Sequence, residues 1–254
     1  RWIGDINYLG GSFIWNMRQY GTLGLSFLSV DYGTIYGTGL LLNAEKDQYP
    51  LGYIDLGKID NVGAYACGLC YGRAISTRFL IGGDIRIVGQ NLGQTQLDSG
   101  LKDNNAVKAV FDAGVKYNTG FHGFRFGMSI RNFSSNIKRE ELEEQLPLLF
   151  TMGMAIDLLD VVAPAFSQNN SLNLAVDFLH PNNYSERVNY GLEFLLLDHF
   201  AIRGGFQTNQ DLASWSAGIG LNYDVGKNNL RFDYSYSDFD LFSGVNRLSL
   251  GIAF

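Results

Sequence analysis

Two cysteines separated by two residues are the first candidates for chemistry in this sequence. Cys67 and Cys70 stand in the stretch YACGLCYG, and a CxxC spacing is typical of metal-binding and redox-active sites. The surrounding residues, however, alternate as the residues of a β-strand do. On a strand, positions i and i+3 point to opposite faces, so the two thiols cannot reach one metal ion or each other. We therefore interpret them as small apolar filling residues and predict no metal site and no cofactor.

Charged residues recur at every second position of many segments. Paired carboxylates can act as general acid and base, but charges that share a confined face more often form structural ion pairs or line a pore. The fourteen residues that we expect to form such a luminal charge network are Asp84, Arg86, Lys108, Asp112, Lys116, Arg125, Arg131, Asp157, Asp177, Glu193, Arg203, Arg231, Asp233 and Arg247. The three histidines lie far apart in sequence, and no catalytic triad spacing or phosphate-binding loop is present. We predict that the protein is not an enzyme.

The elements that carry these charges are predicted to be β-strands. In the stretch LRFDYSYS, residues 230–237, large apolar or aromatic side chains alternate with arginine, aspartate and serine. The predicted strands are 4–17, 21–32, 61–72, 78–90, 107–118, 122–133, 148–159, 170–180, 187–197, 199–208, 211–223, 229–237 and 245–254. Most span about ten residues, which crosses a bilayer when the strand is tilted, whereas strands of soluble proteins average five or six. No apolar run reaches the roughly 18 residues of a transmembrane helix.

The two faces of these strands indicate a membrane barrel and not a soluble sandwich. One face carries glycine, serine, alanine and charges of both signs, and the other carries large apolar and aromatic side chains, as contact with lipid requires. The composition agrees, with 46% hydrophobic residues, 14% aromatic residues and 31 glycines. We predict an all-β fold, a transmembrane antiparallel up-and-down β-barrel, as one domain over residues 1–254. The net charge of −6 argues against nucleic acid as a partner.

The predicted connections differ in length between the two ends of the barrel. The segments 33–60, 91–106, 134–147, 181–186, 209–210 and 238–244 fall at one end, and 18–20, 73–77, 119–121, 160–169, 198 and 224–228 fall at the other. Most long segments share one end, which is typical of outer-membrane barrels. Segments 160–169 and 209–210 depart from this trend.

Two features are irregular. The apolar positions of 21–32 change phase, which predicts a β-bulge near Phe27. The count of thirteen strands is odd, whereas single-chain bacterial barrels usually have even counts. Either segment 4–17 divides at Gly10-Gly11, or one further strand precedes Arg1.

The connection 134–147, SSNIKREELEEQLP, differs from the others in its helical composition. It is either a solvated acidic loop or a short amphipathic helix at the rim that buries Leu142 and Leu146. In the second case it is a candidate partner-binding surface on the cell exterior. The residues of this candidate loop are Glu140, Glu141, Leu142, Glu143, Glu144 and Leu146.

Several stretches together resemble the PorV/PorQ family, within the wider FadL-like outer-membrane barrels. The resemblance covers most of the chain and is strongest from about residue 107 onward. The stretches that carry it are FDAGVKY, FRFGMSIRNFSSNIK, LPLLFTMGMA, LNLAVDFLHPNN, ERVNYGLEFLLLDHFAIRGGF, SAGIGLNY and LRFDYSYSDFDLFSGVNRLSLGIAF. None of them is a catalytic motif.

The resemblance implies a fold and two alternative functions. It implies a fourteen-stranded barrel in which an N-terminal segment before Arg1 carries the first strand and any luminal plug, so that about thirteen strands lie in this sequence. PorV-like members imply a non-enzymatic accessory of type IX secretion that binds the C-terminal signal domains of secreted cargo through exterior loops, beside a secretion channel. FadL-like members imply a channel for hydrophobic small molecules. The luminal charges favour the first.

The last eight residues, RLSLGIAF, resemble the terminal strand that the barrel-assembly machinery recognises. Leu248, Leu250, Ile252 and Phe254 share one face and end on an aromatic residue. The expected location is the bacterial outer membrane, with its lipid as the partner of the apolar face.

Overall fold

The computed structural model describes residues 6–39, 52–59, 62–97, 100–135, 137–139, 142–144, 146–209, 215–239 and 242–254. This part of the chain is almost entirely β-structure. Its helical elements are a 3-10 turn, η2 (Arg18–Tyr20), and a short helix, α1 (Leu158–Val162). No helix among the described residues is long and apolar enough to cross a membrane.

Thirteen strands form one large antiparallel sheet in which each strand pairs with the next along the chain, apart from two inserted hairpins. The strands are β1 (Asn7–Asn16), β2 (Thr22–Asp31), β5 (Gly63–Ala74), β6 (Phe79–Leu97), β7 (Gly100–Asn118), β8 (Arg125–Phe133), β11 (Leu149–Asp157), β12 (Ser171–Pro181), β13 (Arg187–Leu196), β14 (Phe200–Gln207), β15 (Trp215–Val225), β16 (Asn228–Phe239) and β17 (Phe242–Ala253). Each of the thirteen predicted strands corresponds to one of them, so the predicted all-β fold is confirmed.

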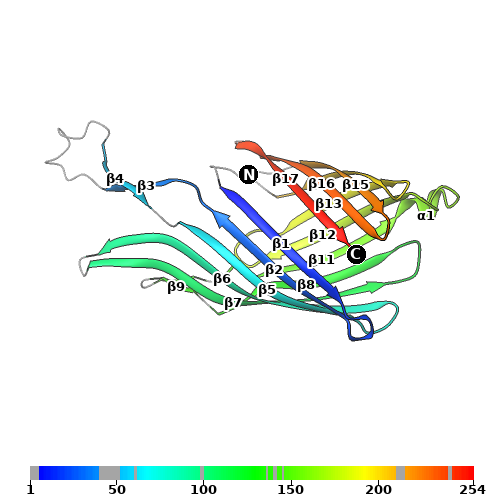
Figure 1. Cartoon of the computed structure of the whole chain (residues 1–254), viewed down its shortest axis with the longest axis horizontal. Coiled ribbons are helices and arrows are strands. Elements are labelled where there is room, and N and C mark those ends of the chain that lie inside the picture. Colours follow the sequence, from blue (N-terminus) through cyan, green and yellow to red (C-terminus); the bar gives the residue numbers. More distant parts are fainter. Residues whose placement is uncertain are drawn as a thin grey trace.

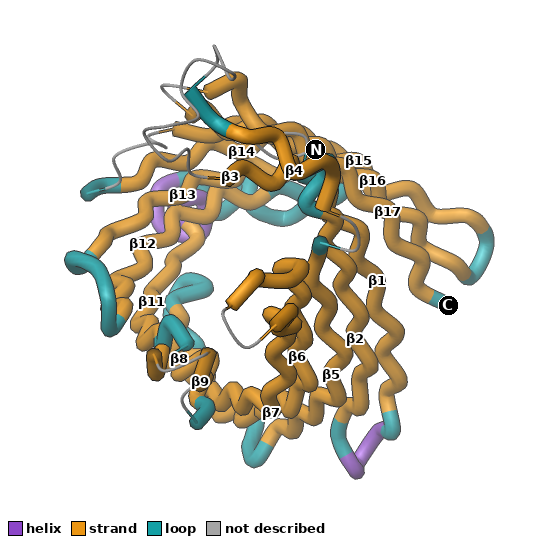
Figure 2. The backbone as a smooth tube through the Cα atoms, turned by 90° about the vertical axis from the view of Figure 1, so that its left-hand side faces the viewer, coloured by secondary structure: helices purple, strands orange, loops and turns teal. Residues whose placement is uncertain are grey.

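The sheet curls round on itself into an open ring (Figure 2). Its two edge strands, β1 and β17, return to the same side of the ring, and no pairing joins them within the described residues. The predicted closure of this sheet into a barrel is therefore not observed among the described residues.

Hairpins gather at one end of the sheet and the helix lies at the other (Figure 1). We call these the hairpin end and the helix end. The hairpin end carries β3 (Ile35–Gly39) paired with β4 (Ile54–Ile59), and the tips of β6 and β7. The prediction that residues 91–106 form a loop is wrong, because β6 and β7 continue their pairing to Leu97 and Gly100. The predicted loop 238–244 is likewise mostly strand, since β16 and β17 run to Phe239 and from Phe242.

The predicted helical alternative for 134–147 is also wrong. β9 (Ile137–Arg139) pairs antiparallel with β10 (Leu142–Glu144). Helix propensity is a weak prior that tertiary context overrides, and a helix of this length is marginal without packing. Glu140 and Glu141 lie outside the described residues.

The bulge predicted near Phe27 is absent, because β2 pairs with β1 and β5 without a shift in register. The alternative division of the first strand at Gly10-Gly11 is also absent, since β1 is continuous. Leu28 and Val30 therefore occupy the face opposite to Leu25 and Phe27. The change of phase reflects an apolar patch on the charged face, and Val30 is buried there.

The charged face is the concave, inner face of the ring. Five of the six buried apolar residues among the described ones are Val30, Ala66, Val110, Ala201 and Val245, and the strand pairing places all five on this face. The opposite, convex face exposes its large apolar side chains, such as Leu9 at 71% and Ile202 at 63%. No large side chain of the described residues is fully buried. The apolar residues thus form an outer surface and not a core.

Candidate functional site on the concave face

The register of the thirteen strands places all fourteen predicted charge-network residues on the concave face. This outcome follows from two properties of the sheet. Side chains alternate between the two faces along each strand, and paired residues of neighbouring strands point to the same face. The charges nevertheless differ in what they contact. They divide into two ion-pair clusters, a set with uncharged partners and a set without partners.

The first cluster centres on Arg86 of β6. Its Nε lies 2.9 Å from Oδ2 of Asp84, and its Nη2 lies 2.6 Å from Oδ2 of Asp112 on β7. Nη2 also donates to Oδ1 of Asn132 on β8 at 3.1 Å. One guanidinium therefore holds two carboxylates that would otherwise repel each other across neighbouring strands.

An irregularity in β8 brings Asn132 into this cluster. The register between β7 and β8 shifts between Phe111 and Ala113, and Asn132 adopts a positive φ of 62°. The backbone N–H of Asn132 donates to Oδ1 of Asp112 at 2.8 Å. Sequence reasoning missed Asn132. Its only signal is that asparagine tolerates the left-handed conformation better than most residues.

The second cluster centres on Arg203 of β14. Its Nε lies 2.5 Å from Oε2 of Glu193 on β13, and its Nη1 lies 2.6 Å from Oδ1 of Asp233 on β16. Arg231 contacts the same aspartate, with Nε 2.7 Å from Oδ2. The side chain of Arg203 reaches over β15 because Gly220 leaves room, since a Cβ there would stand 2.8 Å from Nη1 of Arg203.

Four of the remaining charges have uncharged partners. Lys108 donates to Oγ of Ser135 at 3.4 Å, and Arg247 donates to Oγ of Ser237 at 2.9 Å. Arg125 donates to Oδ1 of Asn173 at 3.1 Å and to the carbonyl of Gly123 at 3.2 Å. Asp157 caps α1 by accepting from the backbone N–H of Leu159 at 3.0 Å, and it also accepts from Leu172 at 3.1 Å.

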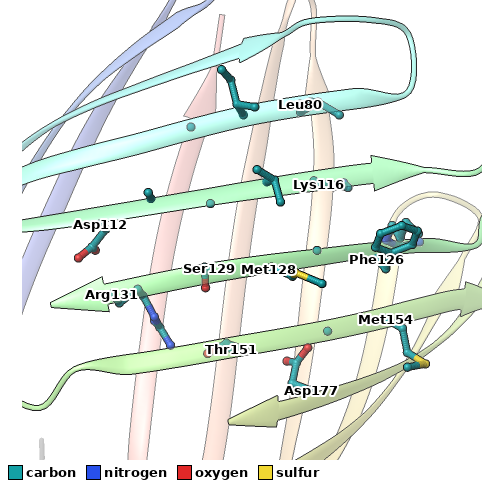
Figure 3. A pocket seen from close by; sticks show the side chains of 18 of the residues that line it. Leu80, Asp112, Lys116, Phe126, Met128, Ser129, Arg131, Thr151, Met154 and Asp177 are labelled. Carbon is teal, nitrogen blue, oxygen red and sulfur yellow. The ribbon is translucent and has the colours of Figure 1, made fainter. Parts of the chain in front are cut away.

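Three charges have no hydrogen-bond or ion-pair partner among the described residues, namely Lys116, Arg131 and Asp177. All three line one open basin of about 620 Å³ that spans β6, β7, β8, β11 and β12. Figure 3 shows the labelled side chains of this basin, including Asp112, Arg131 and Asp177 from three different strands.

Sequence reasoning also missed Arg187, a further cation of this face. Arg187 pairs with Leu179 and therefore points to the concave side. Its guanidinium carbon lies 5.3 Å from the ring centroid of Tyr184, and its Nε is buried without a partner among the described residues. Arg187 is the first residue of β13, so no alternating residues precede it, and the sequence pattern did not assign it to a face.

The cysteines and histidines form no shared site. The register of β5 places Cys67 on the convex face and Cys70 on the concave face, and both are free thiols. His180 and Glu186 approach each other to 3.2 Å between Nδ1 and Oε1 near the hairpin end, where both are exposed. The backbone N–H of Glu186, and after it His180, hold the pKa of this carboxyl below its ordinary value. Within the described ranges, no group of three or more possible ligands is placed to hold a metal ion.

The candidate partner-binding loop can be placed only in part. Leu142, Glu143 and Glu144 belong to β10, and nothing is described of their side chains. Leu146 is half-buried and lines a smaller cavity of about 210 Å³ with Leu28 and Val30. It therefore faces the same cavity as these two side chains of the concave face.

The terminal strand presents the predicted apolar row. Leu248, Leu250 and Ile252 are 65%, 76% and 66% exposed on the convex side of β17, and Phe254, the residue directly after the strand, is 90% exposed. Because β17 is an edge of the sheet, its outer backbone groups lack a strand partner within the described part of the chain.

Comparison with known proteins adds no assignment, since no protein-family model and no curated protein sequence matches the chain. The family resemblance of the sequence stays a prediction.

Proposed function

We propose that this protein is an integral β-barrel protein of the bacterial outer membrane. One observation carries the proposal: the large apolar side chains lie exposed on the convex face, while the charges lie on the concave face. In water, that distribution would expose far more contiguous apolar surface than soluble proteins show. In a bilayer it is the expected arrangement, because the lipid contacts the outside of the strands.

The direction of the edge strands supports closure by one further strand. Neighbouring strands alternate in direction, so an odd count of thirteen leaves β1 and β17 running the same way. A single strand of the opposite direction between them pairs antiparallel with both and removes both edges. Open edges in hydrocarbon cost several kcal/mol for each unsatisfied backbone group. The fourteen strands implied by the family resemblance agree with this requirement.

For the biological role we propose a non-enzymatic accessory of type IX secretion that binds the C-terminal signal domains of cargo at the hairpin end. The β3–β4 hairpin and the long tips of β6 and β7 project there as a surface, on which Tyr36 and Leu56 are 62% and 67% exposed. Exposed aromatic and aliphatic side chains on projecting hairpins suit protein recognition. The charges of the concave face do not favour the alternative of a channel for hydrophobic molecules.

Affinity purification from detergent-solubilised outer membranes tests this role. We expect secreted proteins that share a C-terminal β-sandwich domain to co-purify, together with a large secretion channel. Replacing residues 35–59 with a short linker should abolish the cargo, whereas replacing the loop 182–186 serves as the control and should not. Recovery of the protein with lipophilic molecules and without cargo would contradict the proposal.

A further inference from the structure

The basin on the concave face has a floor of small side chains. Gly127 and Gly153 face each other on β8 and β11, and Gly114, Ser129 and Thr151 form the neighbouring row. Because these side chains are short, the backbone of these three strands lies open to the interior. The basin is an uncovered depression of about 620 Å³, within the 300–1,000 Å³ of small-molecule sites.

Opposite charges face each other across this floor. Lys116 pairs with Gly127, and Gly153 pairs with Asp177, so one row across four strands reads Lys116, Gly127, Gly153, Asp177. At a strand spacing of about 4.8 Å, the two charged residues stand about 14 Å apart at their Cα atoms. The Asp177 carboxylate leans over Gly153, into the space where a side chain at that position would begin.

Two arginines of β8 bound the basin along the strand direction. The backbone of Arg125 is a diagonal neighbour of Lys116, about 7–8 Å away, and its guanidinium extends to Asn173 of β12 at the edge of the basin. Arg131 lies on the other side of the floor, beyond Ser129, and Figure 3 shows it directed toward β11, where Thr151 lies. The hydroxyl oxygen of Thr151 is buried and has no hydrogen-bond partner among the described residues. A ligand on the floor therefore meets hydroxyls between cations.

The charge balance of the basin is positive. Asp84 and Asp112 both form ion pairs with Arg86. Lys116 and Arg131 have no partner among the described residues, and the partners of Arg125 are uncharged. Three cations without an acidic partner thus stand against the single unpaired carboxylate of Asp177. The whole described concave face shows the same bias within a chain of net charge −6. Its strands carry ten cations, Lys102 and Arg187 included, and seven carboxylates, Asp224 included.

We propose that this basin is a binding site for a small hydrophilic molecule of the acidic amino acid class, with two carboxylates and one ammonium group. Lys116 binds one carboxylate, Arg131 binds the other, and Asp177 accepts from the ammonium group. Ser129 and Thr151 hydrogen-bond the molecule between them. The inference concerns the interior wall and holds whether or not the hairpin end binds cargo.

Calorimetric titration of the full-length protein in detergent micelles with glutamate and with glutarate tests the site. Glutarate has both carboxylates and lacks the ammonium group, so glutamate should bind more tightly. Lys116→Gln and Arg131→Gln should each weaken glutamate binding about 10-fold or more, the usual effect of losing a hydrogen bond to a charged group. Asp177→Asn should remove the preference for glutamate over glutarate.

Lys108→Gln is the matched control. It removes the same charge from the same face, but Lys108 lies eight residues from Lys116, about 27 Å along β7. It should leave binding unchanged, and Arg131→Lys should retain more affinity than Arg131→Gln. Circular dichroism and heat-modifiable gel mobility establish that each variant folds. The proposal is overturned if neither ligand binds at about 10 mM, if Lys108→Gln weakens binding as much as Lys116→Gln, or if glutarate binds as tightly as glutamate.

Discussion

A charge placed at the middle of the convex face tests most directly whether this face contacts lipid. Ile219 lies near the centre of β15, points outward and is 56% exposed, with Ile202 and Tyr234 beside it on the neighbouring strands. An arginine at the midplane of a bilayer costs a transmembrane barrel about 2–4 kcal/mol. We therefore expect Ile219→Arg to lower the free energy of unfolding in lipid vesicles by that amount.

Val225 supplies the depth control on the same strand and the same face. It lies six residues further along, about 20 Å at the rise of a strand, and about 15 Å in depth at a tilt of about 40°. The apolar band of such barrels is about 25 Å tall, so position 225 falls near its boundary. Val225→Arg should therefore cost only about 0–1 kcal/mol.

Urea titration of the folded protein in vesicles, followed by tryptophan fluorescence, measures both variants. In water, a substitution at so exposed a position stays within about 0.5 kcal/mol. If Ile219→Arg and Val225→Arg both fall inside that range, the convex face does not contact hydrocarbon and the membrane proposal is wrong.

Four further outcomes are expected. Phe254→Ser should block insertion, because the terminal aromatic residue belongs to the strand that we expect the assembly machinery to recognise; normal heat-modifiable mobility of the variant in membranes would refute this. Arg203→Met should destabilise the protein by about 1–3 kcal/mol, since Arg203 holds two partly exposed carboxylates; an unchanged urea midpoint would show that the cluster contributes nothing. NMR titration should give Glu186 a pKa below that of a glutamate in an unstructured peptide. Its contribution to stability is therefore present above the ordinary glutamate pKa and is lost as the pH falls through the lowered pKa. His180→Ala should reverse only part of that shift, because the backbone N–H is the larger cause; complete reversal would contradict this order.

The tertiary structure determined several features that the alternation of apolar and polar residues does not predict. The tips of β6 and β7 extend as a hairpin because each strand has the other as its partner, although the residues of 91–106 are polar and suggest a loop. The stretch around Glu143 forms a hairpin arm despite its helical composition. The inward position of Leu28 and Val30 depends on Ala64 and Ala66 opposite them, and a local pattern cannot distinguish this from a bulge.

The sequence by itself determined the thirteen strands and the face on which each of the fourteen predicted network charges lies, because the period of two is a local property of every strand. Only the tertiary structure determined which charges meet. Arg203 reaches Asp233 across β15 over Gly220, and the row from Lys116 to Asp177 joins residues sixty-one positions apart. The physical reason is register: it is set between strands, and a shift by two residues keeps every side chain on its face while changing all of its neighbours.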